Sequence, residues 1–257
     1  MAEIKTTYHE EEPIATVTIS NPERRNAVGE PDMEEFADTF RALDGDDDVR
    51  CVILTGEGDA FCAGADLAAS LEMPTAETID RGFHDGVRSI MLCSKPVIAK
   101  VQGPAVGAGA SLAVACDFVY AGESARIGFA FSRIGLTADS GATFILPRLV
   151  GRLQAMELLA TAEIVDADRA EDLGLVTTVV PDDALEECVE ERATDIANGP
   201  TRVLASLKRL LLRSNDSSLE AQLDLESRDQ ERMFNTDDVM EGMSAFMEGR
   251  DPEFSGS

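Results

Sequence analysis

The 257-residue chain lacks tryptophan and has only two histidines and four lysines, so arginine supplies most of its 22 basic residues. With 49 acidic residues the formal net charge is -27. A negative field of this size repels phosphate backbones and anionic lipid surfaces, which disfavours nucleic-acid and membrane binding. No apolar run approaches the roughly 20 residues that a membrane span needs. The first residues contain no apolar signal core, which predicts a cytoplasmic protein.

Cysteine and histidine are too sparse and too scattered for a disulfide framework or a metal site. The five cysteines are odd in number, and no CxxC or HExxH pattern occurs. They therefore read as reduced residues, three of them in apolar stretches. The cysteines are Cys51, Cys62, Cys93, Cys116 and Cys188. The sequence predicts no metal ligands and no bound cofactor.

High net charge can indicate disorder, but 44% of the residues are hydrophobic and regularly spaced, which supports a folded core. The acids are spread along the whole chain, and lysine is scarce. This composition is typical of halophiles whose salty cytoplasm screens repulsion between carboxylates. We therefore expect a halophilic source, the alternative being an ordinary acidic protein.

Short apolar runs alternate with helical periodicity, which indicates an α/β fold. Residues 1–199 are expected to form this core, and Asn198-Gly-Pro200 to end it. Residues 200–257 read as a helical region with a loose tail from Gly249. The expected strands are 14–19, 51–55, 96–101, 117–120 and 176–180. The expected helices are 32–44, 76–92, 109–116, 183–197, 200–213, 218–234 and 237–248.

Two glycine turns follow successive strands, at residues 60–67 and 103–112. Small residues let a ligand approach the backbone, and amide groups at a helix start favour negative charge. The second turn is neither a dinucleotide fingerprint, since position 112 is leucine, nor a phosphate loop, since no GK[ST] follows. One such turn can simply serve helix–strand packing. Two of them can converge on one carbonyl oxygen and stabilise an oxyanion.

The chain resembles the enoyl-CoA hydratase/isomerase (crotonase) superfamily over nearly its whole length. The matching segments are 21–27, 60–67, 95–109, 116–117, 131–136, 146–151 and 170–176. The resemblance implies a spiral of ββα units with a C-terminal helical trimerisation region. It also implies an acyl-CoA substrate without a further cofactor, and assembly as a homotrimer or a dimer of trimers.

Carried over by motif position, the backbone N–H groups of Ala65 and Ala108 would form the oxyanion hole. The two glutamates of family hydratases correspond to Ser111 and Phe131 here. Adding water needs one group that activates water and one that protonates carbon, and neither residue can do this. The resemblance therefore points away from simple hydration.

Asp139 is the remaining carboxylate in this region. The stretch 131–143 resembles the ring-epoxide and enoyl-CoA isomerase branch of phenylacetate catabolism, in which the matching aspartate is the acid/base. A single carboxylate suits double-bond migration, and Phe129, Phe131 and Phe144 would desolvate it. The alternative role for Asp139 is a helix N-cap.

Three other functions stay open. One is a hydratase of fatty-acid oxidation that uses different residues. Another is an aryl-CoA dehalogenase-like enzyme, with Asp139 as nucleophile and His84 activating water. Against it, the paired tryptophans of that group are absent, and His84 can equally be a pocket-wall or solvated residue. The third is a non-catalytic acyl-CoA-binding subunit.

Coenzyme A carries phosphates, so an acidic protein must keep cations near it. Arg24 and Arg25 lie in the segment that matches the family's CoA-contacting loop. By the same resemblance, CoA would be lined by Ala27, Ala63, Asp66 and Leu67, and by Phe246 and Arg250 of a C-terminal segment that often reaches in from a neighbouring subunit.

Overall fold

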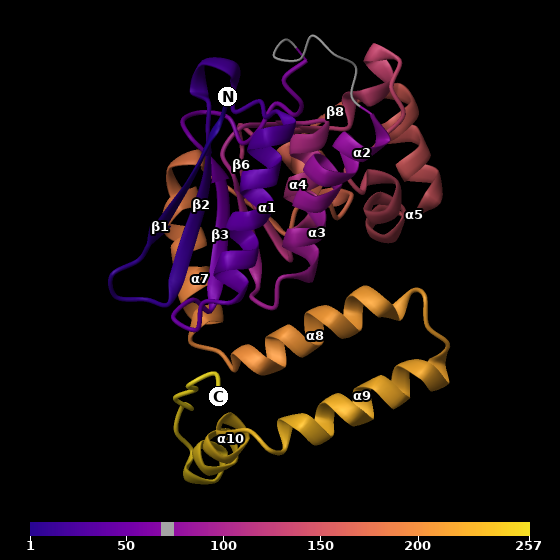
Figure 1. Cartoon of the computed structure of the whole chain (residues 1–257). Coiled ribbons are helices and arrows are strands. Elements are labelled where there is room, and N and C mark those ends of the chain that lie inside the picture. The colour runs from indigo at the N-terminus through magenta and orange to yellow at the C-terminus, as the bar shows by residue number, and fades with distance from the viewer. Residues whose placement is uncertain (68–74) are drawn as a thin grey trace.

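A computed structural model describes residues 1–67 and 75–257. Its main sheet has six strands in the order β1-β2-β3-β4-β6-β9, in which β1 pairs antiparallel with β2 and all other neighbours are parallel. A small second sheet has the order β5-β7-β8. Figure 1 shows α1, α3 and α4 in front of the main sheet and α7 behind it. The predicted α/β class is confirmed.

The strands are β1 (Glu3–Tyr8), β2 (Ile14–Ser20), β3 (Cys51–Gly56), β4 (Val97–Val101), β5 (Pro104–Val106), β6 (Phe118–Gly122), β7 (Arg126–Gly128), β8 (Ile164–Asp166) and β9 (Thr178–Val180). The α-helices are α1 (Glu30–Asp44), α2 (Ala76–Ile79), α3 (Asp85–Leu92), α4 (Ala108–Ala115), α5 (Ala142–Thr161), α6 (Ala167–Asp172), α7 (Leu185–Ala197), α8 (Thr201–Ser214), α9 (Leu219–Met233) and α10 (Asp237–Glu248). A π-helical turn, Asp80–His84, joins α2 to α3, and a 3₁₀ turn covers Ala130–Ile134.

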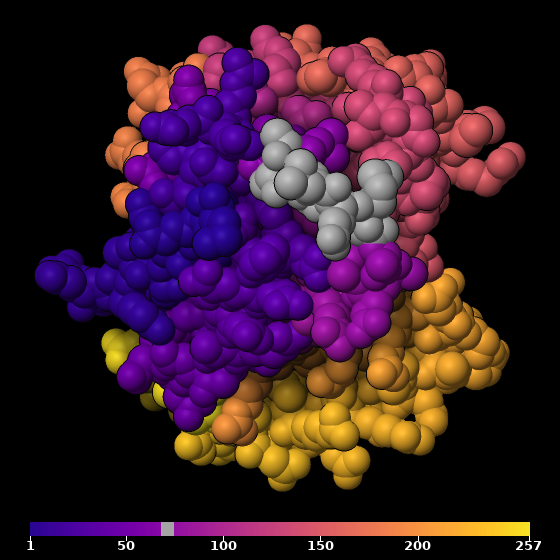
Figure 2. Space-filling view, turned by 45° about the horizontal axis from the view of Figure 1, so that its top comes forward, coloured from indigo at the N-terminus to yellow at the C-terminus, as the bar shows by residue number. Residues whose placement is uncertain are grey.

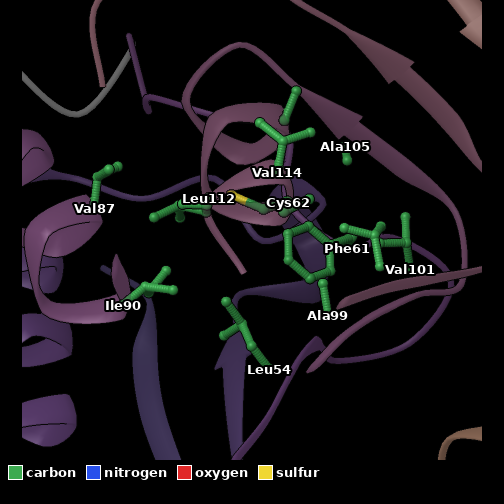
Figure 3. Close-up of a cluster of buried hydrophobic side chains, with 14 of the residues drawn as sticks. Leu54, Phe61, Cys62, Val87, Ile90, Ala99, Val101, Ala105, Leu112 and Val114 are labelled. Atoms are coloured by element: carbon green, nitrogen blue, oxygen red, sulfur yellow. The ribbon is translucent and has the colours of Figure 1, made fainter. Parts of the chain in front are cut away.

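The central strand β3 is buried along its whole length, which explains its unbroken apolar run. Its side chains alternate between two cores. Cys51 and Ile53 point to α7, while Val52 and Leu54 belong to the larger cluster beneath α1, α3 and α4. Figure 3 shows the part of that larger cluster in which Leu54 lies below Leu112 of α4 and Cys62. This packing fixes the strand ends from which the glycine turns begin.

The structure adds short elements that the sequence pattern did not predict: β1, β5, β7, β8 and α6, and the full length of α5. The expectation of a loose tail was wrong. Asp238 accepts hydrogen bonds from the backbone N–H groups of Ser255 and Gly256, and Arg50 donates to the Phe254 carbonyl oxygen at 3.1 Å. The tail is therefore anchored both to α10 and to the core.

Helices α8, α9 and α10 extend below the core, and they form the lower part of the molecule in Figure 2. No helix in residues 1–67 or 75–257 is long and apolar enough to cross a membrane. One partly buried ion pair ties α8 to the sheet. Lys208 donates to Asp117 at 2.7 Å and to the carbonyl oxygens of Ile90 and Lys95.

Asp117 also accepts a hydrogen bond from the Val97 N–H at the start of β4. Burial raises the pKa of its carboxyl group, and the Lys208 ammonium opposes that rise. The pair therefore stabilises both the start of β4 and the docking of α8, provided that both charges are present.

We predict that Lys208→Met lowers the free energy of unfolding by about 2 kcal/mol at pH 8, because a partly buried carboxylate loses its cation. Without Lys208 the folded-state pKa of Asp117 rises further above its unfolded value. The folded protein then takes up a proton as the pH falls, so the deficit should shrink between pH 8 and pH 5. Urea denaturation in molar KCl at both pH values measures this.

The matched control is Arg228→Met, which removes the exposed i,i+4 pair with Asp224. It should cost less than about 1 kcal/mol at either pH. A Lys208→Met deficit as small as that of the control, or one that is unchanged between the two pH values, would contradict the role of the pair.

Candidate active site

The two glycine turns are joined by strand-like hydrogen bonds. The N–H groups of Phe61 and Cys62 both donate to the Pro104 carbonyl oxygen at 3.1 Å, and the Val106 N–H donates to the Cys62 carbonyl oxygen at 2.9 Å. The first turn therefore lies along β5, directly before α4. The two backbone segments that the sequence placed at successive strand ends are neighbours in space.

Glycine is required where these segments touch. Gly64 has φ +91°, and a Cβ there would lie 2.6 Å from the Val106 carbonyl oxygen and 3.3 Å from the Ala108 nitrogen. A Cβ on Gly109 would overlap the Cys62 carbonyl group. Any side chain at either position would push the turns apart.

This approach places Ala65 and Ala108 in the wall of one cavity. Ala108 is the first residue of α4, so its N–H has no partner within the helix. Among the hydrogen bonds of residues 1–67 and 75–257, neither N–H donates to a protein acceptor. Both are available to a ligand oxygen, and the helix start favours negative charge there.

A third loop, residues 21–28, supports the first turn. Asn26 is fully buried, and its side-chain amide donates to the carbonyl oxygens of Glu57 and Ala60 at 2.9 and 2.7 Å. The Val28 N–H donates to the Gly64 carbonyl oxygen at 2.9 Å. These contacts fix the backbone that presents Ala65.

A cavity of about 250 Å³ opens between the two turns and the segment after β7. Its described lining residues are Ala63, Gly64, Ala65, Leu67, Phe83, Val106, Gly107, Ala108, Ala130, Phe131, Arg133, Ile134, Leu136 and Asp139. Asp139 and Arg133 are the two charged residues of this set, and the others are apolar or glycine. Among the described residues, the cavity thus combines two backbone segments whose N–H groups have no protein acceptor with one carboxylate and a mostly apolar wall.

The structure does not support the capping role for Asp139. Helix α5 begins at Ala142, its N-cap is Gly141 with φ +75°, and no side chain caps it. The Asp139 carboxylate accepts a hydrogen bond from the Ser140 hydroxyl at 2.8 Å and lines the cavity. The Asp139 carboxylate is therefore oriented by the Ser140 hydroxyl and does not cap the start of α5.

The two positions of the hydratase glutamates have different surroundings. Ser111 is fully buried, and its hydroxyl donates to the Gly107 carbonyl oxygen at 3.3 Å. Among the described residues that line the cavity, Phe131 is present and Ser111 is not.

Burial raises the pKa of the nearby Cys62 thiol to about 12, so it stays protonated and is a poor nucleophile.

His84 does not belong to the described wall of the cavity, whereas its neighbour Phe83 does. The His84 ring faces Asp80, with 3.5 Å between Nδ1 and Oδ1, and 38% of the side chain is exposed. The structure thus places His84 at the surface beside Asp80 and outside the described lining residues, which fits the solvated role better than a water-activating one.

Two of the three predicted aromatic neighbours of Asp139 also lie elsewhere. Phe129 is in the core, and Phe144 packs against the guanidinium of Arg148 at 3.5 Å. Arg133 was missed by the sequence analysis. The sequence signal that could have identified Arg133 is its position, two residues after Phe131, which stands where family hydratases have a glutamate.

Most residues expected to contact CoA gather beside the first turn. The Arg24 guanidinium donates to both carboxylate oxygens of Asp66 at 2.7 and 2.8 Å, and the Ala63 N–H donates to the Arg25 carbonyl oxygen. Ala27 is buried in the same loop, and Leu67 is 63% exposed at the cavity.

Phe246 and Arg250 lie apart from this group. Phe246 is 87% exposed on α10, and Arg250 is held by Glu241 and Glu248. In Figure 1, α10 lies below the core, at the end of the molecule opposite the start of α2. Within one chain these two residues are not part of the cavity.

Comparisons with known proteins agree with this geometry. The family described as enoyl-CoA hydratase/isomerase matches residues 9–257. The 1,2-epoxyphenylacetyl-CoA isomerase of Escherichia coli (strain K12) is 37% identical over 255 residues, covering 96% of this chain and 97% of that protein. A probable enoyl-CoA hydratase of Rhodobacter capsulatus is 38% identical over 251 residues, covering 97% of each chain.

The crystal structure of an enoyl-CoA hydratase from Bacillus anthracis superposes with a TM-score of 0.93 at 31% identity, covering 99% of both chains. Structural neighbours of this kind carry the crotonase fold, so that predicted fold is confirmed. The chain belongs to the enoyl-CoA hydratase/isomerase family.

Proposed function

We propose that the protein moves a double bond, or isomerises a ring, in an enoyl-CoA thioester, with Asp139 as the acid/base. The observation that carries this proposal is the content of the cavity. Among its described lining residues, Asp139 is the one carboxylate, and it shares an apolar space with the N–H groups of Ala65 and Ala108. That set is sufficient for a proton shuttle and for stabilising an enolate.

The reaction needs few groups. The thioester oxygen accepts hydrogen bonds from Ala65 and Ala108, which makes the protons on C2 more acidic. The Asp139 carboxylate takes a proton from C2, and the electron pair spreads over a dienolate that ends on the bound oxygen. The carboxylic acid then returns the proton to C4. A 3-enoyl-CoA becomes a 2-enoyl-CoA, and no atom is gained or lost.

Hydration is the less suitable reaction for this cavity. It requires a second group to activate water. Phe131 stands in the cavity wall at the position of one hydratase glutamate. Ser111 stands at the position of the other, and its hydroxyl donates a hydrogen bond to the Gly107 carbonyl oxygen. Apolar side chains also exclude the water that hydration would consume.

We further propose that the protein works in the cytoplasm of a halophile as a homotrimer or a dimer of trimers. The C-terminal helices expose large apolar side chains, including Leu211, Leu219 and Phe246, which favours burial against other subunits. In such an assembly Phe246 and Arg250 would contact CoA bound to a neighbouring subunit. Sedimentation of the full chain in molar KCl tests the stoichiometry.

We predict that Asp139→Asn lowers kcat for isomerisation of 3-enoyl-CoA by about 100- to 10,000-fold, because the amide cannot accept the proton. The variant is nearly isosteric, so its affinity for a saturated acyl-CoA should stay within about threefold. Ser140→Ala is the matched control: it removes only the hydrogen bond to Asp139 and should cost far less.

Two results would overturn the isomerase proposal. One is hydration of crotonyl-CoA at the rates of ordinary hydratases, unaffected by Asp139→Asn. The other is tight binding of acyl-CoA without turnover of any 3-enoyl-, 2-enoyl- or aryl-CoA, which would indicate a binding subunit instead.

The oxyanion hole is tested through its backbone. Ala108→Pro removes one N–H at the first position of α4, where proline is well tolerated. We predict a fall in kcat of about 100- to 1,000-fold with little loss of stability. Ala108→Ser keeps the N–H and is the control. A kcat for Ala108→Pro within threefold of the control, in a folded protein, would show that Ala108 holds no oxyanion.

A further inference from the structure

The helical run from Ala76 to Leu92 contains one wide turn. In the π-helical turn Asp80–His84, the Asp85 N–H donates to the Asp80 carbonyl oxygen five residues earlier. Such a turn holds one more residue than an α-helical turn, and it often occurs at functional sites. It lies directly before α3, beside the cavity.

Close packing of two glycines against α1 fixes the rotation of this turn about its helix axis. Gly82 lies against Glu30 of α1, where a Cβ would stand 3.1 Å from the Glu30 Cγ, and a Cβ on Gly86 would overlap the Met33 side chain. These glycines, four residues apart, form one face against α1. A side chain at position 82 would press on the Glu30 backbone, and one at position 86 would displace the end of the Met33 side chain.

Because that face is fixed against α1, the directions of the neighbouring side chains on the helix are fixed as well. Val87 Cγ1 lies 3.1 Å from the position of a Cβ on Gly141, so α3 packs against the turn that carries Asp139. Phe83 precedes Val87 by four residues, shares its face and lines the cavity. His84 is turned outward to Asp80, which also accepts a hydrogen bond from Arg88 at 2.6 Å.

We propose that Phe83, aimed into the cavity by the π-helical turn, determines substrate specificity by limiting the acyl group to a single ring or a chain of about six carbons. This inference rests on the proposed function, since it assumes that the cavity holds the acyl part of a CoA thioester. Phe83 acts through shape and apolar contact, not through a proton.

The size of the cavity supports this limit. A space of about 250 Å³ is smaller than the roughly 300–1,000 Å³ of typical ligand sites, whereas a cavity of about 150 Å³ is enough for benzene. Phe83 and Phe131 are the two aromatic residues of the described wall. Removing the Phe83 ring would extend the space and allow a longer chain.

The test uses saturated acyl-CoAs, which bind without reacting. Dissociation constants for hexanoyl-, decanoyl- and phenylacetyl-CoA are measured by calorimetry for the wild type, Phe83→Ala, Phe83→Leu and the control His84→Ala. In the wild type, hexanoyl- and phenylacetyl-CoA should bind more tightly than decanoyl-CoA. Phe83→Ala should shift the ratio of decanoyl- to phenylacetyl-CoA affinity by about tenfold toward decanoyl-CoA. Phe83→Leu should give a smaller shift in the same direction, and His84→Ala should leave the ratio within twofold.

The proposal is wrong if Phe83→Ala and Phe83→Leu both keep the wild-type ratio, or if His84→Ala shifts it as much as Phe83→Ala. Circular dichroism confirms that each variant is folded. Because no turnover is needed, this outcome is independent of Asp139: specificity can fail while isomerisation stands, and isomerisation can fail while the affinity ratio still shifts.

Discussion

The contact between the Gly64 turn and the start of α4 is the constraint on which the site depends. Hydrogen bonds between Cys62 and Val106 set the spacing, and the missing side chains at Gly64 and Gly109 allow it. Without this approach Ala65 and Ala108 would not line the same cavity, and the proposed oxyanion hole could not form. The buried sheet behind them serves to hold two backbone segments at a distance that no side chain would permit.

Ion pairing within the chain competes for the basic side chains that a CoA phosphate would need. In a chain of net charge -27, arginine side chains readily form ion pairs with neighbouring carboxylates of the same chain. Arg24 is held by Asp66, and Arg250 by Glu241 and Glu248. If these arginines bind CoA as proposed, its phosphate groups have to compete with the acids, and high salt weakens exposed pairs of this kind. A salt-rich environment would thus both screen the surface and loosen its internal ion pairs.

The sequence predicted the parts that follow from periodicity and glycine spacing. Strand β3, helices α7 to α10 and both turns have strong local patterns, so their type was predictable. The strands β5, β7 and β8 have three residues each, which is too short for any period to show. The anchored tail depends on Arg50, about 200 residues away in the chain, and no local pattern reports such a contact.

The placement of His84, which the sequence left open, has a specific physical cause. A regular helix through residues 76–92 leaves its rotation undetermined, so the sequence offers either Phe83 or His84 to the cavity. The π-helical turn and the glycine contacts with α1 decide in favour of Phe83. The choice has chemical consequences, because a histidine there would add a second proton-transfer group and admit water. With Phe83 and Phe131 in the wall, Asp139 is the one acid among the described lining residues. A single carboxylate beside apolar side chains can move a proton from one carbon to another more readily than it can activate water.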